Sequence, residues 1–99
     1  MTHRLVYRPK ALEEVAQAAQ WYEERRIGLS AEFLRALDAA VASVQNGPPH
    51  YPVIRGGMRR ALLRHFPYSL IFSVLQDEIV IFGCVHWRQS PRRWRNRRR

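Results

Sequence analysis

The sequence predicts an α+β domain in which a helical hairpin packs on a small antiparallel sheet, with the element order β-α-α-β-β-β. Two stretches in the first half carry apolar residues at helical spacing, and residues 58–88 contain the alternation and apolar runs typical of strands. Ninety-nine residues are enough for one modest core. We therefore expect a single domain over residues 1–99, with a basic tail from about residue 88 to residue 99.

The sheet is expected mainly from residues 58–88, which we assign to three short strands. In the middle strand the even positions are apolar and share one face, whereas the odd positions form a smaller, more polar face. The even set is Tyr68, Leu70, Phe72 and Val74, and the odd set is Ser69, Ile71 and Ser73. Residues 59–66 form the preceding strand and the apolar run 79–82 the following one. Residues 4–7 predict an opening strand that Pro9 ends.

The first predicted helix covers residues 11–26. Its apolar face consists of Leu12, Val15, Ala16, Ala19 and Tyr22. Glu13 and Glu14 lie in its first turns, where the helix dipole favours acidic side chains. Gly28 is a natural stop for this helix.

The second predicted helix begins after Ser30, which is a good N-cap. Its buried stripe is Phe33, Leu37, Val41 and Val44. The run of asparagine, glycine and two prolines at residues 46–49 ends it. Residues 51–57 are expected to be a loop, with a turn at Gly56-Gly57.

Charge is the strongest compositional signal. Residues 1–57 hold seven basic and six acidic side chains, a net of +1, whereas residues 58–99 hold ten basic and two acidic, a net of +8. All but one of the basic residues are arginine, whose planar fork suits phosphate and carboxylate groups. The partner is therefore expected to be a polyanion or a protein with acidic side chains.

Several classes of function lack their signals. No run of about 18 apolar residues predicts a membrane span, and the N-terminus has no signal-peptide pattern, so we expect a cytoplasmic protein. Cys84 is the single cysteine and is expected to be buried in a strand. The four histidines are scattered, and there is no glycine-rich phosphate loop. We expect neither a metal nor a cofactor.

Three sets of residues have both a structural and a functional interpretation. His86 ends an apolar strand, where it either bonds to backbone or transfers protons, because histidine titrates near neutrality. Arg60 and Arg64 form either a solvated face or an anion site. Trp94, among the tail arginines, either packs the tail onto the body or stacks on nucleic-acid bases.

The order and spacing of several short motifs resemble the RelE/ParE superfamily of toxins from type II toxin–antitoxin systems. The matching residues are Trp21-Tyr22-Glu23, Gly28-Leu29, Phe33-Leu34, Pro48-Pro49, Tyr51-Pro52, Phe66-Pro67-Tyr68, Ile71-Phe72 and Val85-His86-Trp87-Arg88, followed by Pro91 and Trp94. The resemblance extends from about Leu5 to Trp94. It implies a small toxin that halts growth when its cognate antitoxin is lost, and a hetero-oligomer with that antitoxin.

Two branches of this superfamily imply different targets. The ParE branch implies inhibition of DNA gyrase by binding, with Arg88, Arg92, Arg93, Trp94 and Arg95 as target-binding residues. The RelE branch implies ribosome-dependent mRNA cleavage, with His86, Arg60 and Arg64 as catalytic residues. The sequence departs from the RelE pattern because Ser69 follows Tyr68 where an arginine is common, and because Ser90 and Pro91 replace a C-terminal tyrosine. We therefore favour the ParE-like activity and keep the endoribonuclease as the alternative.

A third hypothesis is a nucleic-acid-binding module without toxicity, which the net charge of +9 would suit. The tail distinguishes it from the others, because a free basic tail would bind nucleic acid without sequence preference and with strong salt dependence. Removal of residues 95–99 is expected to cost little stability, since surface changes usually stay within about 0.5 kcal/mol.

Overall fold

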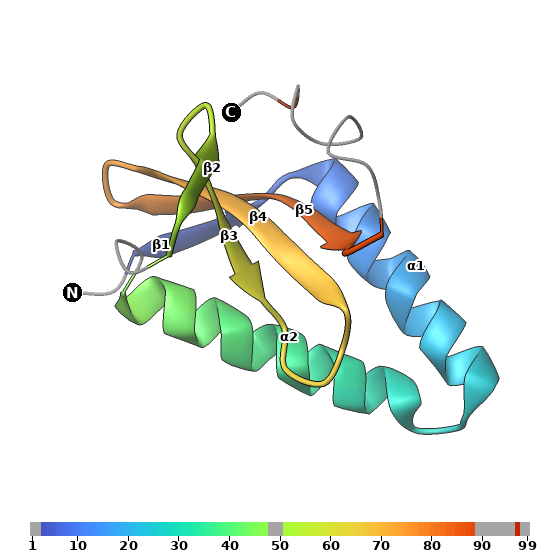
Figure 1. The fold of residues 1–99 in the computed structure, drawn as a ribbon. Helices are drawn as coiled ribbons and strands as arrows, with labels where there is room; N and C mark the ends of the chain where they lie inside the picture. Colours follow the sequence, from blue (N-terminus) through green and yellow to red (C-terminus); the bar gives the residue numbers. More distant parts are fainter. Residues whose placement is uncertain (1–2, 48–50, 89–96, 98–99) are drawn as a thin grey trace.

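Two helices lie against one face of a five-stranded sheet in the computed structural model, which describes residues 3–47, 51–88 and 97 (Figure 1). The elements of the described part follow in the order β1 (Arg4–Tyr7), α1 (Pro9–Arg25), α2 (Leu29–Asn46), β2 (Val53–Arg55), β3 (Met58–Leu62), β4 (Tyr68–Leu75) and β5 (Glu78–His86). The predicted α+β class, with a helical hairpin on a small sheet, is confirmed.

The sheet is mixed, and its strands lie in the order β1-β5-β4-β3-β2. The pairs β3–β4 and β4–β5 are antiparallel, as predicted, and β2 also pairs antiparallel with β3, but β1 runs parallel to β5. A parallel pair needs a long crossover, and the two helices are part of it. The sequence prediction therefore holds for the three strands of residues 58–88 and misses the orientation of the first strand.

Strand β2 corrects the prediction of a loop over residues 51–57. Val53 pairs with Arg59 and Arg55 with Met58, so this short segment forms the outer strand of the sheet. The turn between β2 and β3 consists of Gly56 and Gly57, with φ angles of 57° and 79°. Two consecutive positive φ angles suit a two-residue hairpin turn, and glycine adopts them at low cost.

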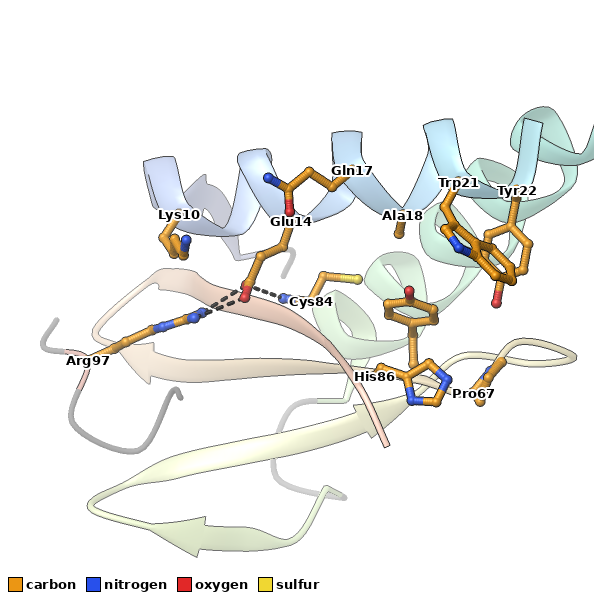
Figure 2. Close-up of a pocket in the computed structure, with 11 residues that line it drawn as sticks. Lys10, Glu14, Gln17, Ala18, Trp21, Tyr22, Pro67, Cys84, His86 and Arg97 are labelled. Carbon is orange, nitrogen blue, oxygen red and sulfur yellow. Dashed lines mark hydrogen bonds and ion pairs between the residues drawn. The ribbon is translucent and has the colours of Figure 1, made fainter. Parts of the chain in front are cut away.

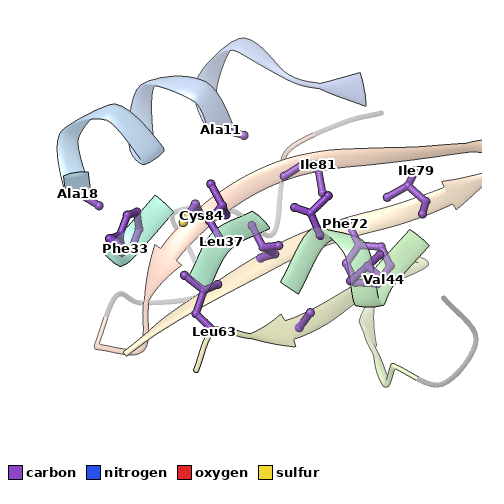
Figure 3. Close-up of a cluster of buried hydrophobic side chains, with 13 residues drawn as sticks. Ala11, Ala18, Phe33, Leu37, Val44, Leu63, Phe72, Ile79, Ile81 and Cys84 are labelled. Carbon is purple, nitrogen blue, oxygen red and sulfur yellow. The ribbon is translucent and has the colours of Figure 1, made fainter. Parts of the chain in front are cut away.

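The main core lies between the helices and the sheet (Figure 3). The predicted stripe of α2 is confirmed, since Phe33, Leu37, Val41 and Val44 are all buried. The predicted face of α1 is wrong in part, because Leu12 is 53% exposed and the fully buried residues are Ala11 and Ala18. Small alanine side chains let a helix approach a sheet closely. Helix α1 therefore faces the sheet with Ala11 rather than with the larger Leu12 beside it.

A second cluster of buried side chains occupies the opposite face of the sheet. It consists of Met58, Ile71, Val80, Phe82 and Val85. The odd positions of β4 were expected to form a more polar face, but Ser69, Ile71 and Ser73 are all buried. The Ser73 hydroxyl donates a hydrogen bond to the Gly57 carbonyl at 3.1 Å, which reduces the cost of its burial.

A β-bulge interrupts β5 at Phe82. Ile71 pairs with Gly83, whereas Phe72 pairs with Ile81, so Phe82 is an extra residue in the ladder. Before the bulge the odd-numbered side chains of β5 face the main core, and after it the even-numbered ones do. Ile79 and Ile81 belong to the main core, and after the bulge Cys84 joins them while Val85 belongs to the second cluster.

The turn between the helices depends on a single carboxylate. Glu23 accepts hydrogen bonds from the backbone N–H groups of Gly28 and Ser30 and from the Ser30 hydroxyl, at 2.6–3.2 Å. Ser30 is therefore not the predicted N-cap: Gly28 takes that place, with a φ of 92°, and Ser30 lies inside α2. These bonds lower the pKa of Glu23, the Ser30 hydroxyl contributing most.

We expect Glu23→Ala to lower the thermal unfolding midpoint at neutral pH, because it leaves two backbone N–H groups without their acceptor. The decrease in midpoint should be smaller in acid. A carboxylate whose pKa is lowered in the folded state stabilises the fold at pH values above its unfolded pKa of about 4.3, and this stabilisation is lost as the pH falls through the folded pKa. Thermal melts at about pH 7 and about pH 3 measure this. Glu24→Ala, one exposed residue further along, is the control and should leave the midpoint unchanged.

Candidate functional site

A groove of about 760 Å³ lies between α1 and the ends of β4 and β5 (Figure 2). One end is charged and the other is aromatic. The charged end is lined by Lys10, Glu14, Gln17 and Arg97, and the aromatic end by Trp21, Tyr22, Pro67, Tyr68 and His86. The groove therefore offers both polar and apolar contacts to a partner.

Helical spacing and the β-bulge together bring these residues to one groove. Lys10, Glu14 and Trp21 recur at intervals of four and seven residues, so they lie along one side of α1. On the sheet side, Tyr68 and His86 are directly paired, and their rings meet edge to face at 5.2 Å. Without the extra residue at Phe82, His86 would face away from α1.

A nearly buried ion pair forms the charged end. The Arg97 guanidinium donates from Nη1 to Oε1 of Glu14 at 2.8 Å and from Nη2 to Oε2 at 2.9 Å. The two side chains are only 16% and 10% exposed. This two-bond fork is the strongest geometry available to an arginine and a carboxylate.

The same pair satisfies the backbone at the bulge. Nη1 of Arg97 also donates to the Phe82 carbonyl at 3.0 Å, and Oε1 of Glu14 accepts the Cys84 backbone N–H at 3.1 Å. Buried backbone groups need such partners, and a bulge disrupts the ladder that normally supplies them. Glu14 therefore contacts the sheet. Its predicted role was only a favourable interaction with the dipole of its own helix.

The aromatic end is continuous with the core. Tyr22 contacts the rings of Phe33, Phe66 and Tyr68, with centroid distances of 5.4, 4.9 and 6.1 Å. Burial raises the pKa of Tyr22 and of Tyr68, so both hydroxyls remain protonated at neutral pH. Trp21 is 48% exposed at the mouth of the groove, which leaves a large apolar surface for a partner.

His86 is half-buried at the end of β5. Its Nδ1 accepts the backbone N–H of Arg88 at 3.0 Å, so the neutral ring carries its proton on Nε2. A histidine that bonds to backbone is the structural interpretation given above. The ring also faces the groove beside Tyr68 (Figure 2).

The structure does not bring the three predicted catalytic residues together. Arg60 pairs with Ile71, whose side chain belongs to the second cluster, so Arg60 lies on the sheet face opposite to the groove and His86. Arg64 is exposed and lines a shallower groove beside α2. Arg60, Arg64 and His86 therefore occupy three separate places.

Of the predicted target-binding residues, the structure places only Arg88, which is exposed just after β5. Arg92, Arg93, Trp94 and Arg95 lie outside the described residues. Arg97 was not predicted as a site residue, although it completes the groove. The position of its partner Glu14 could have indicated a site, because this acidic residue lies next to Ala11, Val15 and Ala18, which face the sheet.

Cys84 is buried as predicted, with 2% of its surface exposed. Burial, together with the Glu14 carboxylate, raises the pKa of its thiol to about 12. We expect its reaction with a disulfide reagent at pH 8 to be slower than that of a free cysteine by roughly three orders of magnitude, because the thiolate is the nucleophile. Absorbance of the released thiol measures the rate, and the same titration in denaturant, where reaction should be fast, is the control.

In residues 3–47, 51–88 and 97, no group of three or more histidine, cysteine, aspartate or glutamate side chains is placed to hold a metal ion. Neither of the helices in this part of the chain combines the length and the apolar character that crossing a membrane requires.

Comparison with known proteins identifies the fold. No protein-family model and no curated protein matches the sequence. Among solved structures, the chain is similar to a chain of the chromosomal ParDE TA system from P. aeruginosa, with 19% sequence identity and a TM-score of 0.75. The likeness covers 86% of this chain and 96% of that chain. Two helices packed on a five-stranded mixed sheet are thus a ParE-like fold.

Proposed function

We propose that this chain is the toxin of a type II toxin–antitoxin system, acting in the cytoplasm, and that it inhibits DNA gyrase by binding it, as the ParE branch does. The observation that carries the proposal is the likeness to a chain of a ParDE system over nearly the whole length of both chains. The motifs spread from Leu5 to Trp94 support a toxin of the RelE/ParE superfamily independently of the structure, and the departures at Ser69, Ser90 and Pro91 favour the ParE branch.

The geometry favours binding over RNA cleavage. Cleavage needs a base, an acid and a charge stabiliser within hydrogen-bond reach of one substrate. Arg60 lies on the face of the sheet opposite to His86, and Arg64 lines a different groove. The ribonuclease therefore stays the second candidate.

The contact of Arg97 also favours a protein target over sequence-independent nucleic-acid binding. A tail that served only as a cationic arm would keep its guanidinium groups in solvent. Arg97 is instead 16% exposed and bonded to Glu14. Arg97 thus forms a shaped contact with the body, which is more useful for recognising a protein surface.

The expected neutralising partner is an antitoxin with an acidic or amphipathic segment that covers the sheet and the helical hairpin. A net charge of +9 favours an acidic segment, and the groove supplies an aromatic surface beside Lys10 and His86 for an amphipathic one. A partner that bound only residues 1–57 would contradict this assignment.

The test is induced expression of the chain with and without a neighbouring gene for a small acidic protein. We expect growth arrest that co-expression relieves, with DNA synthesis falling before RNA and protein synthesis. The purified chain should inhibit gyrase supercoiling and leave ribosome-bound mRNA intact. Cleaved mRNA with normal supercoiling would instead favour the ribonuclease. Salt-sensitive nucleic-acid binding without growth arrest would favour the third hypothesis.

A further inference from the structure

The charged end of the groove has the features of a binding site for a guanidinium group. Two carboxylate oxygens of Glu14 and the carbonyl oxygen of Phe82 converge on the Arg97 side chain at 2.8–3.0 Å. All three are acceptors, and the carboxylate is held in place by the Cys84 backbone N–H at 3.1 Å. The planar, two-pronged arrangement suits arginine and would leave an ammonium group with fewer well-placed bonds.

Gly83 provides the space for this guanidinium. A Cβ atom at residue 83 would lie 2.5 Å from Nη1 of Arg97 and 3.2 Å from Oε1 of Glu14. No real Cβ contact is as short as the first distance, so any other residue would displace the end of the arginine side chain. The bulge and the glycine of β5, together with the carboxylate of α1, therefore make one site from two elements far apart in the sequence.

We propose that Glu14, the Phe82 carbonyl and Gly83 form a receptor for the guanidinium of Arg97, and that Glu14 thereby positions the C-terminal end of the chain for target binding. The second half rests on the proposed function. Glu14 is a positioning residue in this scheme, because it does not contact the target. The guanidinium of Arg97 is bound by Glu14 and therefore does not itself bind a partner. The remaining C-terminal arginines supply the charge that the target meets.

The receptor is tested first, with no reference to a target. Side-chain NMR of ¹⁵N-arginine-labelled protein should show one guanidinium that exchanges slowly with solvent. We expect this signal to disappear in Glu14→Gln and in Gly83→Ala, which displaces the arginine while keeping both charges. Glu13→Gln makes the same charge change on an exposed neighbour and should keep the signal. If the slowly exchanging guanidinium signal persists in Gly83→Ala, the proposed receptor is wrong.

Chemical rescue provides a second measurement. Arg97→Ala removes the guanidinium from the site, so ethylguanidinium at low concentration should raise the unfolding midpoint of this variant, because a ligand that binds only the folded state stabilises it. Ethylammonium should have a smaller effect, and wild-type protein should show neither. Equal effects of the two cations, or the same rise in wild-type protein, would contradict a guanidinium site.

The positioning role is tested with the target. Gly83→Ala and Glu14→Gln should weaken gyrase inhibition about tenfold or more, through lost preorganisation. Glu13→Gln should behave as wild type. Full inhibition by a variant whose Arg97 signal is lost would overturn the positioning role and leave the proposed function intact. A wild-type chain that neither arrests growth nor inhibits gyrase would overturn the proposed function and the positioning role together, whereas the receptor is decided by NMR and rescue.

Discussion

Replacing Arg92, Arg93 and Arg95 with glutamine should abolish growth arrest while the protein remains folded and bound by its antitoxin. These arginines are the cations that we assign to the target contact, and electrostatic complementarity governs both the rate and the specificity of such association. Growth after induction and inhibition of gyrase supercoiling measure the effect. Thermal unfolding shows whether the fold is retained.

The matched control removes the same charge from the body of the protein. Arg8, Arg35 and Arg55 are exposed, and their replacement by glutamine also lowers the net charge by three. This control should stay toxic. If both triple variants lose activity equally, the effect is one of total charge. If the tail variant stays toxic while folded His86→Ala is inactive, the ribonuclease becomes the better assignment.

Substitution is preferable to truncation because Arg97 is part of the folded structure. The basic composition of residues 95–99 predicts that their removal costs little stability, and the Glu14–Arg97 contact argues against this prediction. Truncation would leave a carboxylate that is 10% exposed without its counter-ion. Breaking a buried pair in this way costs about 3–5 kcal/mol, and a pair at this exposure belongs near the lower end.

Phe33→Ala should destabilise the protein by about 3–5 kcal/mol, the usual range for removing a buried phenylalanine. Phe33 is 0% exposed. Its ring meets those of Tyr22, Phe66 and Tyr68 at centroid distances of 5.3–5.4 Å. Chemical denaturation with a fitted slope measures the change in unfolding free energy.

The neighbouring Leu34 is the control for this prediction. It is 39% exposed on the same helix, so Leu34→Ala removes an apolar side chain and has nearly the same effect on helix propensity. Leu34→Ala should lower the unfolding free energy clearly less than Phe33→Ala does. Equal losses for the two variants would mean that the aromatic cluster is not the centre of the core.

The sequence contains enough information for the helices and strands because their periodicity is a local property. The stripe from Phe33 to Val44 and the strand at Arg4–Tyr7 follow directly from spacing and from proline. The face of α1 was predicted only in part: Val15, Ala19 and Tyr22 pack on the core, but the buried Ala11 and Ala18 were missed because alanines carry little hydrophobic signal.

The site was harder to predict because it depends on long-range pairing. Gly83 is a weak local signal of a bulge, since an isolated glycine inside a strand can mark one, but it does not show that Cys84 and His86 face the helices. The partnership of Glu14 and Arg97 joins residues 83 positions apart, and arginine is abundant in that part of the sequence. The separation of Arg60 from His86 likewise follows from strand register, which a sequence pattern specifies weakly.

The parallel pairing of β1 with β5 has a consequence for how the protein is made. These strands are joined by contacts such as Arg4 to Glu78, 74 positions apart, and β5 lies between β1 and β4 in the sheet. Synthesis proceeds from the N-terminus, so the strand that links the two parts of the sheet leaves the ribosome last. A nascent chain holds its helical hairpin without Ile79 and Ile81, the residues that the hairpin must cover. The hairpin therefore stays uncovered, and the two parts of the sheet stay separate, until β5 has been synthesised.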